Sequence, residues 1–120
     1  MTTTWTVPDC YIPLDSTDDV ESHESVCVLN DGRDDAQLVF TAYFADREPQ
    51  ESSTMVVPAQ RCLHLRTGQQ AAVGGLVIEP GVPYGLKITS DRPVHLQYSR
   101  LDTTQAAYSL MTAIPVAVMG

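Results

Sequence analysis

Short runs of β-branched and aromatic residues, each interrupted by proline, glycine, aspartate or asparagine, are the feature that most constrains the fold of this chain. Many of the runs alternate between apolar and polar residues, a period of two that gives a strand one apolar face. In Ala36–Ala45, for example, Leu38, Phe40 and Phe44 fall on the same face. We therefore predict an all-β chain of about nine strands. The predicted strands are Thr2–Val7, Ser25–Asn30, Ala36–Ala45, Thr54–Val57, Gln60–Arg66, Leu76–Ile78, Tyr84–Ser90, Val94–Arg100 and Tyr108–Val118.

This many short strands in 120 residues favours a two-sheet β-sandwich over an α/β fold. We expect a single domain over residues 1–120, because the sequence contains no second core, linker or repeat. Residues 30–33 (Asn-Asp-Gly-Arg) are the clearest hairpin signal, and Pro58-Ala59 predicts a corner or a bulge. Asp102 can cap a single helical turn through Gln105, and we expect no longer helix.

Charge and hydropathy exclude two classes of protein. The net charge is −8, with Lys87 as the single lysine, so the broad basic footprint of a nucleic-acid-binding protein is absent. No apolar run approaches the ~20 residues needed to span a bilayer. The first residues have neither the basic nor the apolar region of a secretory signal, which makes the cytoplasm the expected location.

The cysteines and histidines do not form a metal motif. Cys10, Cys27 and Cys62 show no C-x-x-C spacing, so we expect reduced, mostly buried thiols. The three histidines are separated by 41 and 31 residues, which fits no local ligand motif. We predict neither a metal site nor a cofactor.

Catalytic signatures are also missing, since the chain has no G-x-S-x-G, P-loop, H-E-x-x-H or G-x-G-x-x-G motif. Ser22-His23-Glu24 resembles a compressed catalytic triad, but neighbouring side chains of an extended segment point to opposite faces. We therefore predict a binding protein and not an enzyme. The best rival is a hydrolase or isomerase that uses His64 with Glu24 or Asp102 as base and orienting group.

Polar side chains gather instead on two predicted strands and on the Ser22-His23-Glu24 step. The stretch from Val94 to Gln105 begins as a strand and then runs into Arg100 and Asp102, which are costly to bury without partners. On Gln60–Arg66, Arg61 shares the apolar parity and needs a carboxylate partner or a rim position. The candidate carboxylates are Glu24, Asp46, Glu48 and Asp102.

Two interpretations of these polar residues remain open: a ligand pocket, or arginine–carboxylate struts inside the fold or between subunits. The uncharged segment Ile114–Met119 bears on the second, because an exposed apolar tail is unusual in a soluble monomer. We expect that segment to pack on the domain or on a neighbouring subunit.

Six blocks of sequence, in one order, resemble the Anabaena sensory rhodopsin transducer family. They run from about residue 11 to residue 112, most of the chain. The blocks are Tyr11-Ile12-Pro13, Ser22–Asn30, Tyr43–Pro49, Val57–Arg66, Ser90–Val94 and Gln97–Gln105. Cys10 and Leu14 depart from the family pattern, as does the loop Thr67–Ala72, which lacks an aromatic-led acidic segment.

The resemblance implies a β-sandwich that assembles as a homotetramer and belongs to a group of prokaryotic small-molecule-binding domains. The implied ligand is a sugar or a related polar or anionic compound, and some members are soluble partners of a membrane photoreceptor. The expected function is a soluble sensor or transducer, with an adaptor for a membrane rhodopsin as the alternative. The shared polar positions that would bind the ligand are His23, Glu24, Arg61, His64, Arg66, Gln97, Arg100 and Asp102.

Overall fold

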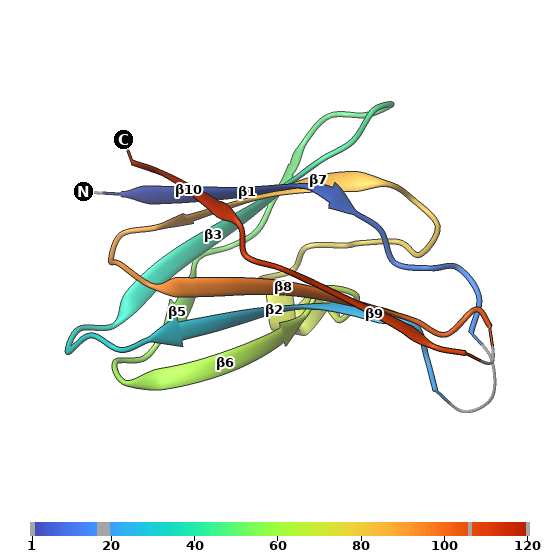
Figure 1. The fold of residues 1–120 in the computed structure, drawn as a ribbon. Helices are drawn as coiled ribbons and strands as arrows, with labels where there is room; N and C mark the ends of the chain where they lie inside the picture. Colours follow the sequence, from blue (N-terminus) through green and yellow to red (C-terminus); the bar gives the residue numbers. More distant parts are fainter. Residues whose placement is uncertain (1, 17–19, 106, 120) are drawn as a thin grey trace.

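Two antiparallel sheets face each other in a computed structural model that describes residues 2–16, 20–105 and 107–119 (Figure 1). The larger sheet has the order β10-β1-β7-β3-β4, and β5 also pairs with β3. Its strands are β1 (Thr3–Cys10), β3 (Ala36–Tyr43), β4 (Gln50–Glu51), β5 (Met55–Val57), β7 (Tyr84–Ser90) and β10 (Val116–Met119).

The smaller sheet has the order β6-β2-β8-β9. Its strands are β2 (His23–Asn30), β6 (Arg61–Arg66), β8 (His95–Asp102) and β9 (Ser109–Ala113). A 3-10 helix, η1 (Gln70–Val73), follows β6. The predicted all-β sandwich is therefore confirmed, with ten strands described where about nine were expected. No helix among the described residues is long and apolar enough to cross a membrane.

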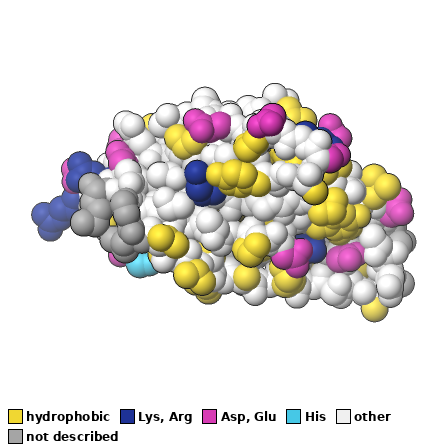
Figure 2. All heavy atoms as spheres, turned by 90° about the horizontal axis from the view of Figure 1, so that it is seen from above, with side chains coloured by type: hydrophobic (Ala, Val, Ile, Leu, Met, Phe, Trp, Pro, Cys, Tyr) yellow, Lys and Arg dark blue, Asp and Glu magenta, His cyan; other side chains and the backbone are white. Residues whose placement is uncertain are grey.

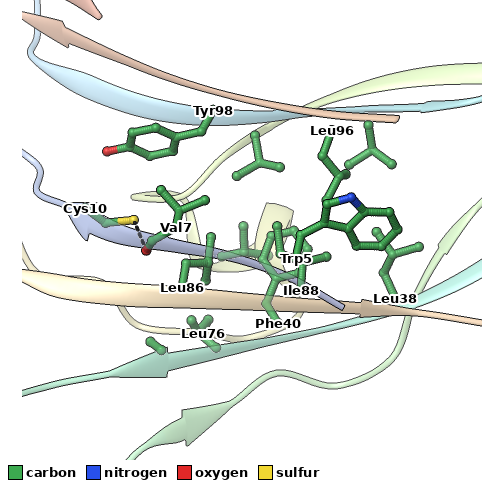
Figure 3. Close-up of a cluster of buried hydrophobic side chains, with 14 of the residues drawn as sticks. Trp5, Val7, Cys10, Leu38, Phe40, Leu76, Leu86, Ile88, Leu96 and Tyr98 are labelled. Carbon is green, nitrogen blue, oxygen red and sulfur yellow. Dashed lines mark hydrogen bonds between the residues drawn. The ribbon is translucent and has the colours of Figure 1, made fainter. Parts of the chain in front are cut away.

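The core fills the space between the sheets and follows the period-two pattern of the sequence. Alternate residues of β7 are buried along its whole length, and Phe40, Ile88 and Tyr98 are fully buried. Burying one such side chain contributes about 1.5–3 kcal/mol. Figure 3 shows the labelled core side chains entering from both sheets: Trp5, Val7, Leu38, Phe40, Leu86, Ile88, Leu96 and Tyr98.

Two strand boundaries near prolines differ from the prediction: Pro8 does not end its strand, whereas Pro115 lies at a break between two strands. β1 continues past Pro8 to Cys10, with a register shift between Val7 and Cys10. Pro8 is tolerated there because β10 pairs only with residues 3–6 of β1, so Pro8 lacks a neighbour on that side. The predicted single strand over 108–118 is wrong, since it breaks at Ile114-Pro115 into β9 on the smaller sheet and β10 on the larger one.

The hairpin predicted at residues 30–33 is also wrong, because this turn passes from β2 in the smaller sheet to β3 in the larger sheet. The buried Asn30 side chain holds the turn, as its Nδ2 donates to the carbonyl oxygen of Asp34 at 2.9 Å and its Oδ1 accepts from the Gly32 amide at 3.1 Å. The corner predicted at Pro58-Ala59 is confirmed, since it joins β5 to β6 across the sheets.

Three smaller predictions are corrected by the structure. Residues 76–78 form an extended loop and not a strand, with the Val77 amide donating to the side-chain Oε1 of Gln50 at 2.6 Å. Gln50 belongs to β4 (Gln50–Glu51), which is not among the strands predicted from the sequence. Cys62 is exposed, although mostly buried thiols were expected.

The uncharged C-terminal segment is only partly covered. The backbone of β10 pairs with β1, and Figure 1 shows the chain crossing from β9 beside the smaller sheet to β10 on the larger one. The side chains of Ile114, Val116 and Val118 remain 73%, 73% and 56% exposed. The backbone of β10 in this segment therefore forms hydrogen bonds with β1, but the apolar side chains of the segment remain exposed to solvent.

Candidate functional site

The structure divides the polar residues predicted from the sequence between the two faces of the smaller sheet. Strand alternation decides the division, since neighbouring residues on β2, β6 and β8 point to opposite faces. Glu24 and Arg100 face the sandwich interior, and Asp102 shares their parity but is only partly buried at the end of β8. His23, His64, Arg66 and Gln97 lie on the outer face. Arg61 takes a rim position at the start of β6, where its Nη1 donates to the carbonyl oxygen of Gln60 at 2.9 Å.

Glu24 is the most completely enclosed of these residues, with no exposed surface. Its Oε2 accepts hydrogen bonds from the Tyr11 amide at 2.7 Å and from the Tyr98 hydroxyl. Its Oε1 accepts from Thr67 Oγ1 at 3.0 Å and from the Tyr84 hydroxyl. These donors come from both sheets and from two connecting segments, so the carboxylate ties the sandwich together.

Burial and the Glu24 carboxylate act together on the neighbouring acids. Burial raises the pKa of the Tyr84 and Tyr98 hydroxyls well above the ordinary value, and the Glu24 charge raises both further. The pKa of the Cys10 thiol rises to about 12 for the same two reasons, burial first. Both hydroxyls therefore stay protonated and donate, and the thiol stays un-ionised and unreactive.

Arg100 lies beside this network, directly across from Glu24 in the β2–β8 register. Its side chain is only 17% exposed, and its Nη2 lies 3.3 Å from the Asp9 carbonyl oxygen and 3.7 Å from Asp9 Oδ1. Burial opposes its charge, but the attraction of Tyr98, Asp9 and Glu24 prevails and raises the pKa of the guanidinium. Arg100 is thus held as a strut next to the buried carboxylate.

Asp102 closes a turn at the end of β8. Its Oδ1 accepts from the Thr104 amide at 2.9 Å and from the Thr104 hydroxyl at 2.6 Å, and these bonds lower the pKa of the carboxyl. The helical turn predicted to follow Asp102 is absent from residues 102–105, since Asp102 ends β8 and residues 104–105 form a bend. Asp102 therefore has a local structural partner.

Two outer-face residues, His23 and Arg66, converge on a cleft of about 140 Å³ at the end of the smaller sheet. We call it the His23–Arg66 cleft. Arg66 Nη2 lies 3.3 Å from Glu21 Oε1, and His23 Nδ1 lies 2.9 Å from the Glu21 carbonyl oxygen. The remaining lining residues are Ile12, Ser22, Gly68, Gln69, Ile78 and Pro80. The cleft combines charged and amide groups with an apolar wall.

The other two outer-face residues, His64 and Gln97, line a separate hollow of about 310 Å³, which we call the outer hollow. It lies over the middle of β6, β2 and β8, where Cys27 stands between His64 and Gln97 in the register. His64 is exposed here, whereas Glu24 and Asp102 have the inward parity of their strands. The sheet thus separates His64 from both acids of the predicted catalytic rival.

The match along the sequence decides the family. The family model described as Anabaena sensory rhodopsin transducer matches residues 2–117. The chain belongs to this family. The family resemblance found in the sequence is therefore confirmed.

Two solved structures are similar to the chain. A crystal structure of Thermotoga maritima 1070 is 34% identical with a TM-score of 0.83, over 94% of this chain and 91% of that chain. The structure of the Anabaena sensory rhodopsin transducer is 31% identical with a TM-score of 0.68, over 80% of this chain and 93% of that chain. No curated protein sequence matches the chain. The fold and family of the chain are those of the Anabaena sensory rhodopsin transducer.

The partners of the polar residues in this transducer family member were only partly foreseen. Tyr98 shares the inward parity of its strand with Arg100, so alternation alone could have placed it near Glu24. Tyr84 carries no such signal, since it comes from the other sheet. The arginines also pair with carboxylates outside the predicted set: Arg100 with Asp9 and Arg66 with Glu21.

Proposed function

We propose that this protein is a non-catalytic signalling module that binds a polar small molecule, sugar-like or anionic, in the His23–Arg66 cleft. The observation that supports this proposal most directly is that His23 and Arg66, from different strands, line one cleft together with Glu21 and Gln69. Membership of the transducer family supports the signalling role. Of the predicted ligand-binding residues, these two are the pair that we assign to direct contact.

The chemistry of the cleft fits a ligand rich in hydroxyl or carboxylate oxygens. Arg66 uses one nitrogen on Glu21, and a guanidinium carries further N–H donors for a forked contact. His23 holds Nδ1 against the Glu21 carbonyl, which leaves Nε2 for a ligand. The volume corresponds to about five water molecules at ~30 Å³ each, which suits a small ligand.

A binding role is favoured over catalysis because the hydroxyl in the cleft already has structural partners. Ser22 Oγ donates to the Asp15 carbonyl oxygen at 3.0 Å and accepts from the Thr103 amide at 2.9 Å. A serine nucleophile needs its hydroxyl proton on a general base. We infer that Ser22 shapes the cleft and does not attack a substrate.

Assembly as a homotetramer in the cytoplasm forms part of the proposal. The uncharged strands β9 and β10 support it, because Leu110, Val116 and Val118 are exposed apolar groups on a chain of net charge −8. Like-charged copies associate most readily through an uncharged surface. On the face seen in Figure 2, Lys and Arg side chains are scattered among acidic groups, so nucleic acid is not a proposed partner.

The alternative function is an adaptor for a membrane photoreceptor. It is supported by the 31% identity to a protein described as a sensory rhodopsin transducer. In that case the receptor would bind a protein surface, and the cleft would have no ligand.

A thermal-shift screen of sugars, sugar acids and small dicarboxylates tests the proposal. We expect at least one class to raise the melting temperature of the wild type but not of Arg66→Ala or His23→Ala. Arg61→Ala is the matched control, because Arg61 lies on the same strand but about 16 Å away, outside the cleft. Equal shifts in Arg66→Ala and Arg61→Ala, or no shift with any compound, would contradict the proposal.

A further inference from the structure

The outer hollow brings together two thiols that the proposed function does not use. Cys27 on β2 and Cys62 on β6 both line it, and both are free. The register pairs Cys27 with His64 and Leu29 with Cys62, so the two cysteines are diagonal neighbours on the same outer face. The hollow shares no lining residue with the His23–Arg66 cleft.

The diagonal spacing of Cys27 and Cys62 suits a metal ion that bridges the two sulfurs better than a disulfide bond between them. Diagonal neighbours across an antiparallel pair are about 7–8 Å apart, somewhat less between their Cβ atoms. A disulfide needs Cβ atoms roughly 3.5–4.5 Å apart, so this pair is too distant to bond directly. A metal ion with metal–sulfur bonds of about 2.3 Å, as for zinc, adds over ~4 Å between the sulfurs and closes the gap.

We propose that Cys27 and Cys62 bind one soft metal ion of the Cu(I) class in the outer hollow. Each thiol releases its proton to solvent on binding, and the ion is held by two thiolate sulfurs. Among the described residues no three His, Cys, Asp or Glu side chains are arranged to hold a metal ion. Two-coordinate Cu(I) therefore fits better than tetrahedral zinc, which needs four ligands.

The surroundings of the two sulfurs agree with this assignment. His64, opposite Cys27, and His95, opposite Leu29, line the same hollow, and His95 Nε2 lies 3.5 Å from Asp31 Oδ2. A shallow site on an outer sheet face is open to exchange with a metal carrier.

The third cysteine provides a matched control within the same chain. Cys10 is buried between the sheets, and its Sγ donates to the Val7 carbonyl oxygen at 3.4 Å (Figure 3). It faces the core, whereas Cys27 and Cys62 face outward. Removal of Cys10 should leave metal binding unchanged.

Titration of the reduced full chain against the Cu(I)–bicinchoninate complex, without oxygen, tests the proposal. We expect the wild type and Cys10→Ala to withdraw one equivalent of Cu(I) per chain. Cys27→Ala and Cys62→Ala should each lower the affinity by more than about tenfold while circular dichroism stays that of the wild type. Bound Cu(I) should also slow alkylation of Cys27 and Cys62.

Three results would overturn the proposal. The wild type leaves Cu(I) on the chelator, or Cys27→Ala and Cys62→Ala bind as the wild type does. In the third, Cu(I) leaves the alkylation rates of Cys27 and Cys62 in the wild type unchanged, a result that does not depend on how any variant folds. None of these three outcomes bears on sugar or anion binding, because no cysteine lines the His23–Arg66 cleft.

Discussion

The Tyr84 hydroxyl of the larger sheet donates a hydrogen bond to the buried Glu24 carboxylate of the smaller sheet. Tyr98 donates to the other carboxylate oxygen from the neighbouring strand. A buried carboxylate is costly unless donors surround it, and here two hydroxyls of raised pKa, one hydroxyl of Thr67 and one amide do so. The contact thus joins the sheets at a polar point within an apolar core.

Replacement of Glu24 by alanine should lower the free energy of unfolding by at least about 3 kcal/mol, because several buried donors lose their acceptor together. Urea denaturation measures this. Glu21→Ala, which removes a carboxylate that is 77% exposed, is the control and should cost within about 1 kcal/mol. Equal stability of the two variants would show that the Glu24 network is not a structural tie.

Replacement of Arg100 and replacement of Arg66 by alanine should differ in their effect on the free energy of unfolding. Arg100→Ala should cost about 1.5–3 kcal/mol, because Arg100 is nearly enclosed beside Glu24 and bonds to Asp9. Arg66→Ala should cost within about 1 kcal/mol, since its partner Glu21 is exposed. Comparison of the urea midpoints at equal m-value checks both. A larger loss of stability for Arg66→Ala than for Arg100→Ala would contradict the assignment of Arg100 as the structural strut and of Arg66 as the ligand contact.

Strand alternation explains how much of the fold was predictable. Leu38 and Phe40 are buried, as the period of two predicted, because a strand in a sandwich buries every second residue. The hairpin prediction at residues 30–33 was wrong because Asn-Asp-Gly also suits a turn that passes from one sheet to the other. The local sequence does not distinguish these two kinds of turn. β4, with two residues, is too short to carry a pattern.

The site was less predictable, for a reason of geometry. The sequence placed His64 and Arg66 on one face of their strand, and the structure agrees. It could not show that Arg66 turns to a cleft at the sheet end while His64 opens on another hollow. Nor could it show that Glu24 lies on the far side of the sheet, because strand order is a property of the assembled fold.

Stability should fall in alkali. The unfolded Cys10 thiol ionises near its ordinary pKa of 9.0, whereas burial and Glu24 raise the folded value to about 12. Between these values the unfolded state has lost a proton that the folded state retains, so rising pH favours unfolding. Tyr84 and Tyr98 act in the same direction above pH 10.0, their ordinary pKa.

Urea unfolding at a series of alkaline pH values should therefore show a free energy of unfolding that declines from about pH 9.0 toward about pH 12. Cys10→Ala should make the first part of the decline shallower, because it removes one of the linked protons. An unchanged slope in that variant, or stability that rises with pH, would contradict the linkage.

Charges placed on the uncharged strands should dissociate the proposed homotetramer. Val116 and Val118 are exposed, so aspartate at both positions leaves the core unchanged and adds repulsion at the contact surface. Sedimentation at micromolar concentration should give a four-chain mass for the wild type and a smaller mass for the double variant. Val56→Asp, at an exposed position of β5 on the opposite edge of the larger sheet, is a control for charge alone. A wild type of single-chain mass would reject the assembly.

Ligand binding at the His23–Arg66 cleft is the central claim, and an amide-resolved NMR titration tests it most directly. A polar compound that raises the melting temperature is added to the ¹⁵N-labelled protein, and the shifted backbone amides are mapped. The account predicts that the largest changes cluster at Glu21–His23 and Arg66–Gln69, and that Arg66→Ala removes them. Changes confined to the outer hollow or to β9, with the cleft amides unmoved, would contradict it.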